Sequence, residues 1–156
     1  MTEITEGSKA PSFDMATSDG GRVSSAALKG HPYVLYFYPK ADTPGCTSES
    51  QDFSALAAEF AAAVGTTVIG VSRDPVRKLD RFKAKYDLNL VLASDELGEV
   101  TEAFGVWVEK SMYGRSYMGV ERATFLIDGE GVVRRVWRKV KVKGHAAEVL
   151  AAAAES

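Results

Sequence analysis

The sequence predicts an α/β fold, a central mixed β-sheet with helices on both faces, built as a single domain over residues 1–156. The runs Tyr33–Tyr38 and Thr67–Ser72 are apolar without alternation, which is typical of strands buried on both faces of a sheet. Each run is followed by a helix-forming segment, so two βα units succeed one another. A hairpin and a last helix complete the order and add antiparallel pairing to the parallel strands.

The N-terminal part is expected to contain short elements only. Ser18–Gly21 is a turn signal between two extended pieces within Pro11–Val23. Ser24–Lys29 is predicted to form a short helical turn that Gly30 closes. The first buried strand follows directly.

Two helices are expected to follow the two buried strands. Pro44–Val64 is predicted to be a helix that Gly65 ends. Its apolar stripe consists of Phe53, Leu56, Ala57 and Phe60. Asp74 is expected to cap the second helix, with Pro75 at its first position and an end near Tyr86.

A second series of short elements follows. Leu90–Ala93 resembles a strand, and Leu97–Phe104 is predicted to be a short helix stopped by Gly105. The segment Glu109–Gly119 is then a long polar and aromatic connection. It is interpreted as a cover over the core, as one wall of an active site, or as a self-association patch.

The C-terminal third is expected to close the sheet. Ala123–Asp128 and Val132–Trp137 flank the turn Gly129–Gly131 and predict a hairpin. Gly144–Ala154 is alanine-rich and predicts a last helix. A thioredoxin-like α/β sandwich is the simplest architecture with this order of elements.

Charge and composition exclude several classes of function. Nineteen basic and 21 acidic residues give a net charge of -2, which does not favour nucleic acid or an anionic membrane as partner. Residues 1–11 lack the apolar core of a signal peptide, and no stretch is long and apolar enough to span a bilayer. A single cysteine cannot form an intramolecular disulfide, so a reducing compartment, the cytoplasm, is expected.

The only cysteine, Cys46, carries the strongest functional signal. The buried strand ends at Pro39, and a turn leads to Thr43, which is placed to cap the next helix. Pro44 then suits the first helical position, and Cys46 falls at the third. Unpaired amides and the helix dipole favour a negative sulfur there, while Gly45 allows a small substrate to approach. The sequence therefore predicts a reactive thiol rather than an inert core cysteine.

These residues resemble the peroxiredoxin family. The Pro-x-x-x-Thr-x-x-Cys pattern of Pro39–Cys46 matches its active-site motif. The longer match Tyr36–Thr47, with Glu49 just beyond it, is similar to the bacterioferritin comigratory protein (peroxiredoxin Q) subgroup. A second matching block is Tyr117–Asp128, and the likeness extends over about residues 10–150.

The resemblance implies a thioredoxin fold and a thiol-dependent peroxidase that serves antioxidant defence and redox homeostasis, with no metal, flavin or haem. By position, Cys46 is the peroxidatic cysteine, which attacks the peroxide and becomes a sulfenic acid. Thr43 would hydrogen-bond the peroxide, and Pro39 would shield the thiolate from bulk water. Arg122 would hold the thiolate and polarise the peroxide, and Glu49 would orient Arg122. A guanidinium suits this role, because it is always charged and offers a planar fork of donors.

The chain departs from many members of the subgroup at Gln51, which stands where they carry a resolving cysteine. The sulfenic acid on Cys46 must then be resolved by an external thiol or by Cys46 of another copy. The sequence predicts a one-cysteine cycle with a thioredoxin-, glutaredoxin- or glutathione-type reductant, in a monomer or weak homodimer. Over-oxidation of the unresolved sulfenic acid is a further expectation.

Three other functions stay open for a reactive Cys46. A peroxide sensor or redox-switched chaperone would use the same thiol without turnover. A monothiol oxidoreductase acting on disulfides would leave Thr43 and Arg122 unexplained. A cysteine–histidine hydrolase would need His31 or His145 beside the sulfur, but capping or surface positions are expected for both.

The remaining features favour structural roles. A basic run after the hairpin turn is interpreted as a solvated edge strand, with docking of an acidic reductant as the alternative. It comprises Arg134, Arg135, Arg138, Lys139, Lys141 and Lys143. Trp107 and Trp137 are expected in the core. No histidine or cysteine cluster has the spacing of zinc ligands.

Overall fold

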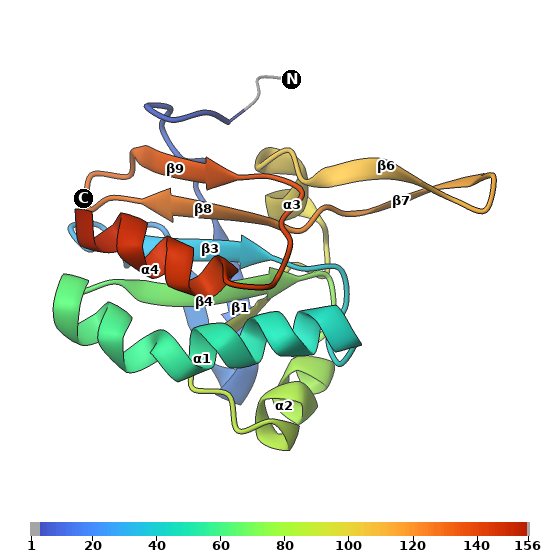
Figure 1. The fold of residues 1–156 in the computed structure, drawn as a ribbon, viewed down its shortest axis with the longest axis horizontal. Helices are drawn as coiled ribbons and strands as arrows, with labels where there is room; N and C mark the ends of the chain where they lie inside the picture. The colour runs from blue at the N-terminus through green and yellow to red at the C-terminus, as the bar shows by residue number, and fades with distance from the viewer. Residues whose placement is uncertain (1–3, 156) are drawn as a thin grey trace.

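A seven-stranded mixed sheet forms the centre of the molecule in the computed structural model, which describes residues 4–155. Its strand order is β2-β1-β5-β4-β3-β8-β9 (Figure 1). The strands are β1 (Asp14–Thr17), β2 (Arg22–Ser24), β3 (Tyr33–Phe37), β4 (Thr67–Ser72), β5 (Val91–Ser94), β8 (Ala123–Ile127) and β9 (Val133–Trp137). Strands β3, β4 and β5 are parallel, whereas β1, β2, β8 and β9 pair antiparallel to their neighbours.

Helices cover both faces of this sheet, as the sequence predicts. They are α1 (Pro44–Val64), α2 (Val76–Lys85), α3 (Glu99–Ala103) and α4 (His145–Glu155), with a 3-10 turn at Ser18–Gly20. Apolar residues of α1, α2 and α4 share one core, and those of α3 belong to a second core. Figure 1 shows α1 and α4 side by side in front of the sheet.

Strand β3 divides the two cores, because its side chains alternate between the faces of the sheet. Val34 and Tyr36 pack into the core beneath α1, while Leu35 and Phe37 pack into the core on the α3 side. Every residue of β3 is buried, which explains its unbroken apolar sequence. Gly70 in β4 faces Tyr36, where an added Cβ would lie 2.6 Å from the tyrosine ring.

The predicted elements are confirmed, with small differences at their ends. The turn predicted over Ser24–Lys29 is formed by residues 25–30, because Ser24 belongs to β2, and Gly65 ends α1 in the left-handed conformation. The expected cap of the second helix is wrong. Pro75 is the capping residue and α2 begins at Val76, because the Asp74 carboxylate accepts hydrogen bonds elsewhere.

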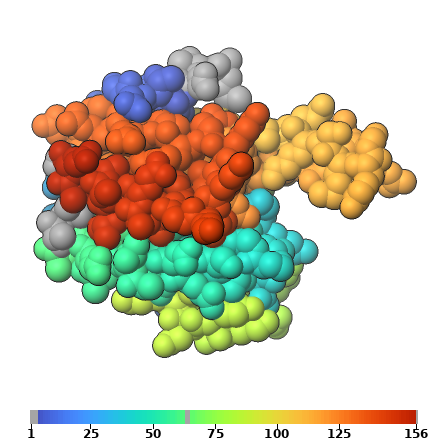
Figure 2. Space-filling model, in the orientation of Figure 1, coloured from blue at the N-terminus to red at the C-terminus, as the bar shows by residue number. Residues whose placement is uncertain are grey.

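A hairpin that the sequence analysis did not predict occupies the segment expected to be a connection. Strands β6 (Trp107–Met112) and β7 (Arg115–Val120) form a separate two-stranded sheet. Tyr113 and Gly114 both have positive φ, 53° and 78°, as a type I′ hairpin turn requires. The hairpin projects from the body as an arm (Figures 1 and 2), so it does not cover the core as one interpretation held.

Within the described part of the chain, no helix is long and apolar enough to cross a membrane.

Candidate active site

Cys46 lies where the central strand meets the first helix. It is the third residue of α1, and the whole residue is 1% exposed. Thr43 precedes the helix in extended conformation, but its side chain does not cap the helix. Its hydroxyl instead donates a hydrogen bond of 2.8 Å to the carbonyl oxygen of Lys40. The oxygen of Thr43 is therefore left with lone pairs that can accept a hydrogen bond.

The loop between Pro39 and the helix is fixed at two points. The backbone N–H of Ala41 donates to Asp74 Oδ2 at 2.8 Å. The Asp42 carboxylate accepts from Tyr86 Oη at 2.5 Å and from Lys85 Nζ at 2.9 Å. Because Asp42 has a positive φ of 62°, these contacts hold an uncommon backbone conformation that places Thr43 directly before α1.

Arg122 joins the sulfur to a buried carboxylate. Its Nη2 lies 3.4 Å from Cys46 Sγ, and its Nη1 lies 2.6 Å from Glu49 Oε1. Glu49 is one helical turn beyond Cys46, so both groups point to the same side of α1. The guanidinium fork thus spans the Cys46 sulfur and the Glu49 carboxylate, and the Arg122 side chain is 18% exposed.

The charge of Glu49 is poorly solvated. Burial raises the pKa of Glu49 to about 7, although Arg122 acts in the opposite direction. Its second oxygen, Oε2, is buried and has no hydrogen-bond partner among residues 4–155. Burial also disfavours the charge on Arg122, but Glu49 and Cys46 favour it more and hold the pKa of Arg122 above its ordinary value. Arg122 therefore stays cationic beside the sulfur.

The backbone of Arg122 is held by contacts that the sequence analysis missed. Glu121 accepts hydrogen bonds from Arg138 Nε at 2.7 Å, from Arg138 Nη2 at 2.9 Å and from the backbone N–H of Lys139 at 3.0 Å. The carbonyl oxygen of Arg122 accepts from the N–H of Val140 at 3.0 Å. Part of the predicted basic run thus fixes the segment between β7 and β8.

Two further residues approach the guanidinium and the sulfur. A Cβ at Gly45 would lie 3.1 Å from Arg122 Nη2, so this glycine leaves the space that the guanidinium uses. Lys110 of β6 is half-buried, and its pKa is lowered by burial and by Arg122, while Cys46 favours its charge. Lys110 was not anticipated, since only the tertiary structure brings the hairpin to this end of the sheet.

Of the five site residues taken from the sequence, three are joined by direct contacts: Cys46, Glu49 and Arg122. Thr43 is one turn from the sulfur at the start of α1. Pro39 is half-buried between the buried Tyr38 and the anchored loop.

Neither histidine is placed to act as a base on the sulfur. His31 is exposed in a loop. His145 is buried rather than at the surface, so the expected capping or surface position is wrong for this residue. Its Nε2 lies 2.8 Å from Thr124 Oγ1, and its ring packs against Phe53 and Trp137. Both tryptophans are half-buried at the margins of the two cores rather than fully inside them.

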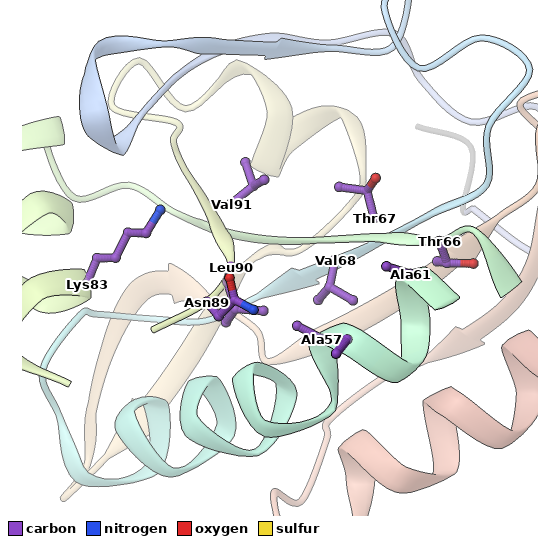
Figure 3. A pocket seen from close by; sticks show the side chains of 10 residues that line it. Ala57, Ala61, Thr66, Thr67, Val68, Lys83, Asn89, Leu90 and Val91 are labelled. Carbon is purple, nitrogen blue, oxygen red and sulfur yellow. The ribbon is translucent and has the colours of Figure 1, made fainter. Parts of the chain in front are cut away.

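Outside this site, we looked in the described residues for a metal-binding cluster and for a hollow near the thiol. No group of three His, Cys, Asp or Glu side chains in residues 4–155 could hold a metal ion. A hollow of about 380 Å³ lies between the later part of α1 and the starts of β4 and β5 (Figure 3). Cys46 follows the opposite, C-terminal end of the neighbouring parallel strand β3, so this hollow is separate from the thiol site.

A buried sulfur at a helix start, beside a permanently charged guanidinium, on a thioredoxin-like sheet defines a thiol enzyme of the thioredoxin-fold class. Comparisons with known proteins specify the class further. Residues 7–136 match the AhpC/TSA family. The chain is 47% identical to peroxiredoxin Bcp of Xanthomonas campestris, covering 97% of this chain and 96% of that protein. It is 46% identical to peroxiredoxin Bcp of Bacillus subtilis, covering 94% and 93%.

Solved structures agree with these sequence comparisons. The structure of the Xanthomonas campestris bacterioferritin comigratory protein superposes with a TM-score of 0.86 at 48% identity, covering 90% of this chain and 89% of that one. The chain therefore belongs to the AhpC/TSA family and is a peroxiredoxin of the bacterioferritin comigratory protein (peroxiredoxin Q) group, a thiol peroxidase. This membership favours a turning-over enzyme over the sensor and chaperone alternatives.

Proposed function

We propose that Cys46 is the peroxidatic residue of this enzyme and that Arg122 is the group that activates the peroxide. The thiolate attacks one peroxide oxygen, so that an S–O bond forms while the O–O bond breaks. Two electrons pass from sulfur to the peroxide: the attacked oxygen stays on sulfur as the sulfenic hydroxyl, and the other oxygen leaves and takes up a proton to become water or an alcohol. The products are a sulfenic acid on Cys46 and the reduced substrate. The single observation that carries the proposal is the 3.4 Å contact between Arg122 Nη2 and Sγ.

Arg122 and Thr43 act on the peroxide from fixed positions in this proposal. Negative charge develops on the leaving oxygen, and a donor already aimed at that oxygen lowers the barrier. Thr43 accepts a hydrogen bond from the peroxide, because its own proton is committed to the Lys40 carbonyl. The peroxide is thus held by a donor on one side and an acceptor on the other.

Glu49 and Pro39 have supporting roles in the proposed site. Glu49 is a positioning residue, because its Oε1 fixes the Nη1 arm of Arg122 and leaves Nη2 for the sulfur. Pro39 adds apolar surface between the buried strand and the loop, and so limits the access of bulk water to the thiolate. Both roles depend on Arg122 being held in a single orientation.

The second half of the cycle requires a thiol from outside. Gln51 is exposed on α1, and the chain has no cysteine other than Cys46. An external thiol therefore attacks the sulfenic sulfur, forming a mixed disulfide and releasing water, and a second thiol restores Cys46. We place this cycle in the cytoplasm, in a monomer or weak homodimer, with a thioredoxin-, glutaredoxin- or glutathione-type reductant.

The proposed substrates are hydrogen peroxide and small organic hydroperoxides. The comparison structure from Xanthomonas campestris comes from a study of alkyl peroxide reduction by that protein, and its identity to this chain supports extending the activity. Sustained consumption of hydrogen peroxide and of an alkyl hydroperoxide in the presence of dithiothreitol tests the proposal. Mass spectrometry then locates the intermediate. A sulfenic acid and a mixed disulfide on Cys46 are expected, and absence of both would refute the one-cysteine cycle.

A further inference from the structure

The β6–β7 hairpin carries large apolar side chains into solvent. Met112 is 55% exposed, Tyr117 45% and Met118 48%. Aromatic and methionine side chains are enriched where proteins bind one another, and clustered exposed examples mark interaction sites. The hairpin is thus a candidate surface for a partner.

The pairing of the two strands assigns these side chains to opposite faces. Residues directly opposite one another in an antiparallel pair project to the same face, and successive residues alternate. Lys110 pairs with Tyr117, and Met112 pairs with Arg115, so these four share one face, here termed the Lys110 face. Met118 pairs with Glu109 on the other side of the hairpin.

The Lys110 face is the one that belongs to the active-site end of the molecule. The half-buried Lys110 side chain runs back along the hairpin toward the body, since a Cβ at Gly119 would lie 3.3 Å from its Cδ. Its pKa, which is lowered mainly by burial, also responds to the charges of Arg122 and Cys46. Figure 1 shows the hairpin leaving the body at the end where α1 begins, and Figure 2 shows it standing clear of the surface there. Met112 and Tyr117 therefore extend outward from the thiol site along the same face.

The chemistry of the cycle requires a partner at this end. Cys46 is 1% exposed and has no internal thiol to resolve it, so an external thiol must be brought to it. The Lys110 face carries two cations, Lys110 and Arg115, and no acidic side chain among its paired residues. A second copy docking through the same face would place like charges together, whereas a partner with acidic residues would complement them.

We propose that the Lys110 face of the hairpin is the docking surface for a protein dithiol reductant that presents acidic and apolar residues around its nucleophilic cysteine. Met112 and Tyr117 supply the apolar contact, and Lys110 and Arg115 supply the charge. The inference rests on the proposed one-cysteine cycle and adds the kind of partner that completes it.

Steady-state kinetics of two methionine variants test the proposal. Peroxide consumption is measured at varied concentrations of reduced thioredoxin, and separately with dithiothreitol, for the unmodified protein, Met112→Ser and Met118→Ser. Met118→Ser is the matched control, because it removes an equally exposed methionine from the opposite face. Met112→Ser is expected to lower kcat/KM for thioredoxin about tenfold, as for a residue that carries much of the binding energy, with the dithiothreitol rate unchanged. Met118→Ser is expected to change neither rate.

Each alternative outcome overturns the inference in a recognisable way. Equal effects of the two variants, or none, would show that the Lys110 face is not used. A loss with dithiothreitol as well would show damage to the thiol site. Turnover of the unmodified protein with dithiothreitol but not with thioredoxin would refute a protein reductant of this type and leave the peroxidase intact. A dimer in sedimentation that Met112→Ser dissociates would assign the face to self-association. Absence of turnover with every thiol would instead refute the proposed function itself.

Discussion

Two arginine–glutamate pairs meet at one peptide bond, and they differ in what they leave unsatisfied. Arg122 pairs with Glu49 through one hydrogen bond, and its other arm contacts Cys46. The adjacent residue, Glu121, pairs with Arg138 through two hydrogen bonds and accepts a third from the backbone. Arg138 thus directs two hydrogen bonds to one carboxylate, whereas Arg122 divides its two contacts between a carboxylate and a sulfur.

The two glutamates respond oppositely to their surroundings. Burial dominates at Glu49 and raises its pKa to about 7. Burial also raises the pKa of Glu121, but the hydrogen bonds and charges of Arg138 and Lys139 outweigh it and leave that pKa below its ordinary value. In the proposed site, the satisfied Glu121–Arg138 pair fixes the backbone, while the Glu49–Arg122 pair leaves one arm of a cation for the reacting group.

Removing the shared arginine should have the largest effect. Arg122→Met is expected to slow the reaction of reduced Cys46 with hydrogen peroxide by about 100- to 1000-fold, the usual consequence of losing a donor to a developing charge. Stopped-flow measurement with substoichiometric peroxide gives this rate.

Arg138→Met is the matched control for that variant. It removes the arginine of the neighbouring pair without removing a contact to sulfur, so a loss of less than about tenfold is expected. Similar losses in Arg122→Met and Arg138→Met would contradict the distinction between the two pairs.

The two glutamates should also differ in how they make the free energy of unfolding depend on pH. Since the pKa of Glu49 rises from an ordinary 4.5 to about 7 on folding, the native state binds more protons than the unfolded state between these values. The free energy of unfolding should therefore fall as pH rises through this window, by roughly 3 kcal/mol from this group. Urea unfolding at pH 5 and pH 8 should show a smaller fall for Glu49→Gln. Parallel profiles for the two proteins would rule out the buried carboxylate as the cause.

Glu121 should show the reverse dependence with a smaller magnitude. Its pKa is lowered on folding, so its stabilisation is present above pH 4.5 and is lost as pH falls below that value. Glu121→Gln is expected to lower the free energy of unfolding at pH 7 by about 1–2 kcal/mol, the contribution of charged hydrogen bonds. The difference in the free energy of unfolding between Glu121→Gln and the unmodified protein should shrink in acid. A difference that stayed constant with pH would show that the charge of Glu121 is not its cause.

A smaller effect is expected from crowding the guanidinium. Gly45→Ala places a methyl group 3.1 Å from Arg122 Nη2, within the tight range where the neighbour must shift. We expect a loss of several-fold in the rate with peroxide, because misplacing a catalytic donor is costly. An unchanged rate would show that Nη2 can move without consequence.

The sequence was sufficient for the parts of the site that local rules govern. Pro44 at a helix start and Cys46 two residues later form one continuous turn, so their relation could be predicted without tertiary structure. Arg122 and Glu49 are 73 residues apart, so only the family resemblance predicted that they would be in contact. Their contact in the structure agrees with the expected arrangement, and the roles stay proposals.

The features that were missed depend on long-range contacts or on weak turn signals. Asp74 resembled a helix cap, but its carboxylate instead anchors the loop at Ala41. The β6–β7 hairpin turns at Tyr113 and Gly114, a pair without the Asn-Gly or Asp-Gly signal that marks such turns. Residues 107–112 and 115–120 also lack the regular apolar–polar alternation of a half-buried strand, so the sequence carried no second signal for it. His145 is buried because α4 packs on α1, which its position in the sequence does not reveal.

One rate constant tests most directly the central claim that the shared guanidinium activates the peroxide. Reduced protein is mixed with substoichiometric hydrogen peroxide, and the rate is compared with that of a simple thiolate at equal pH and equal thiolate concentration. The arrangement of Arg122, Thr43 and Cys46 predicts a rate constant several orders of magnitude above the simple thiolate. A rate constant equal to that of the simple thiolate would contradict the claim, because the site would then stabilise the thiolate without acting on the peroxide.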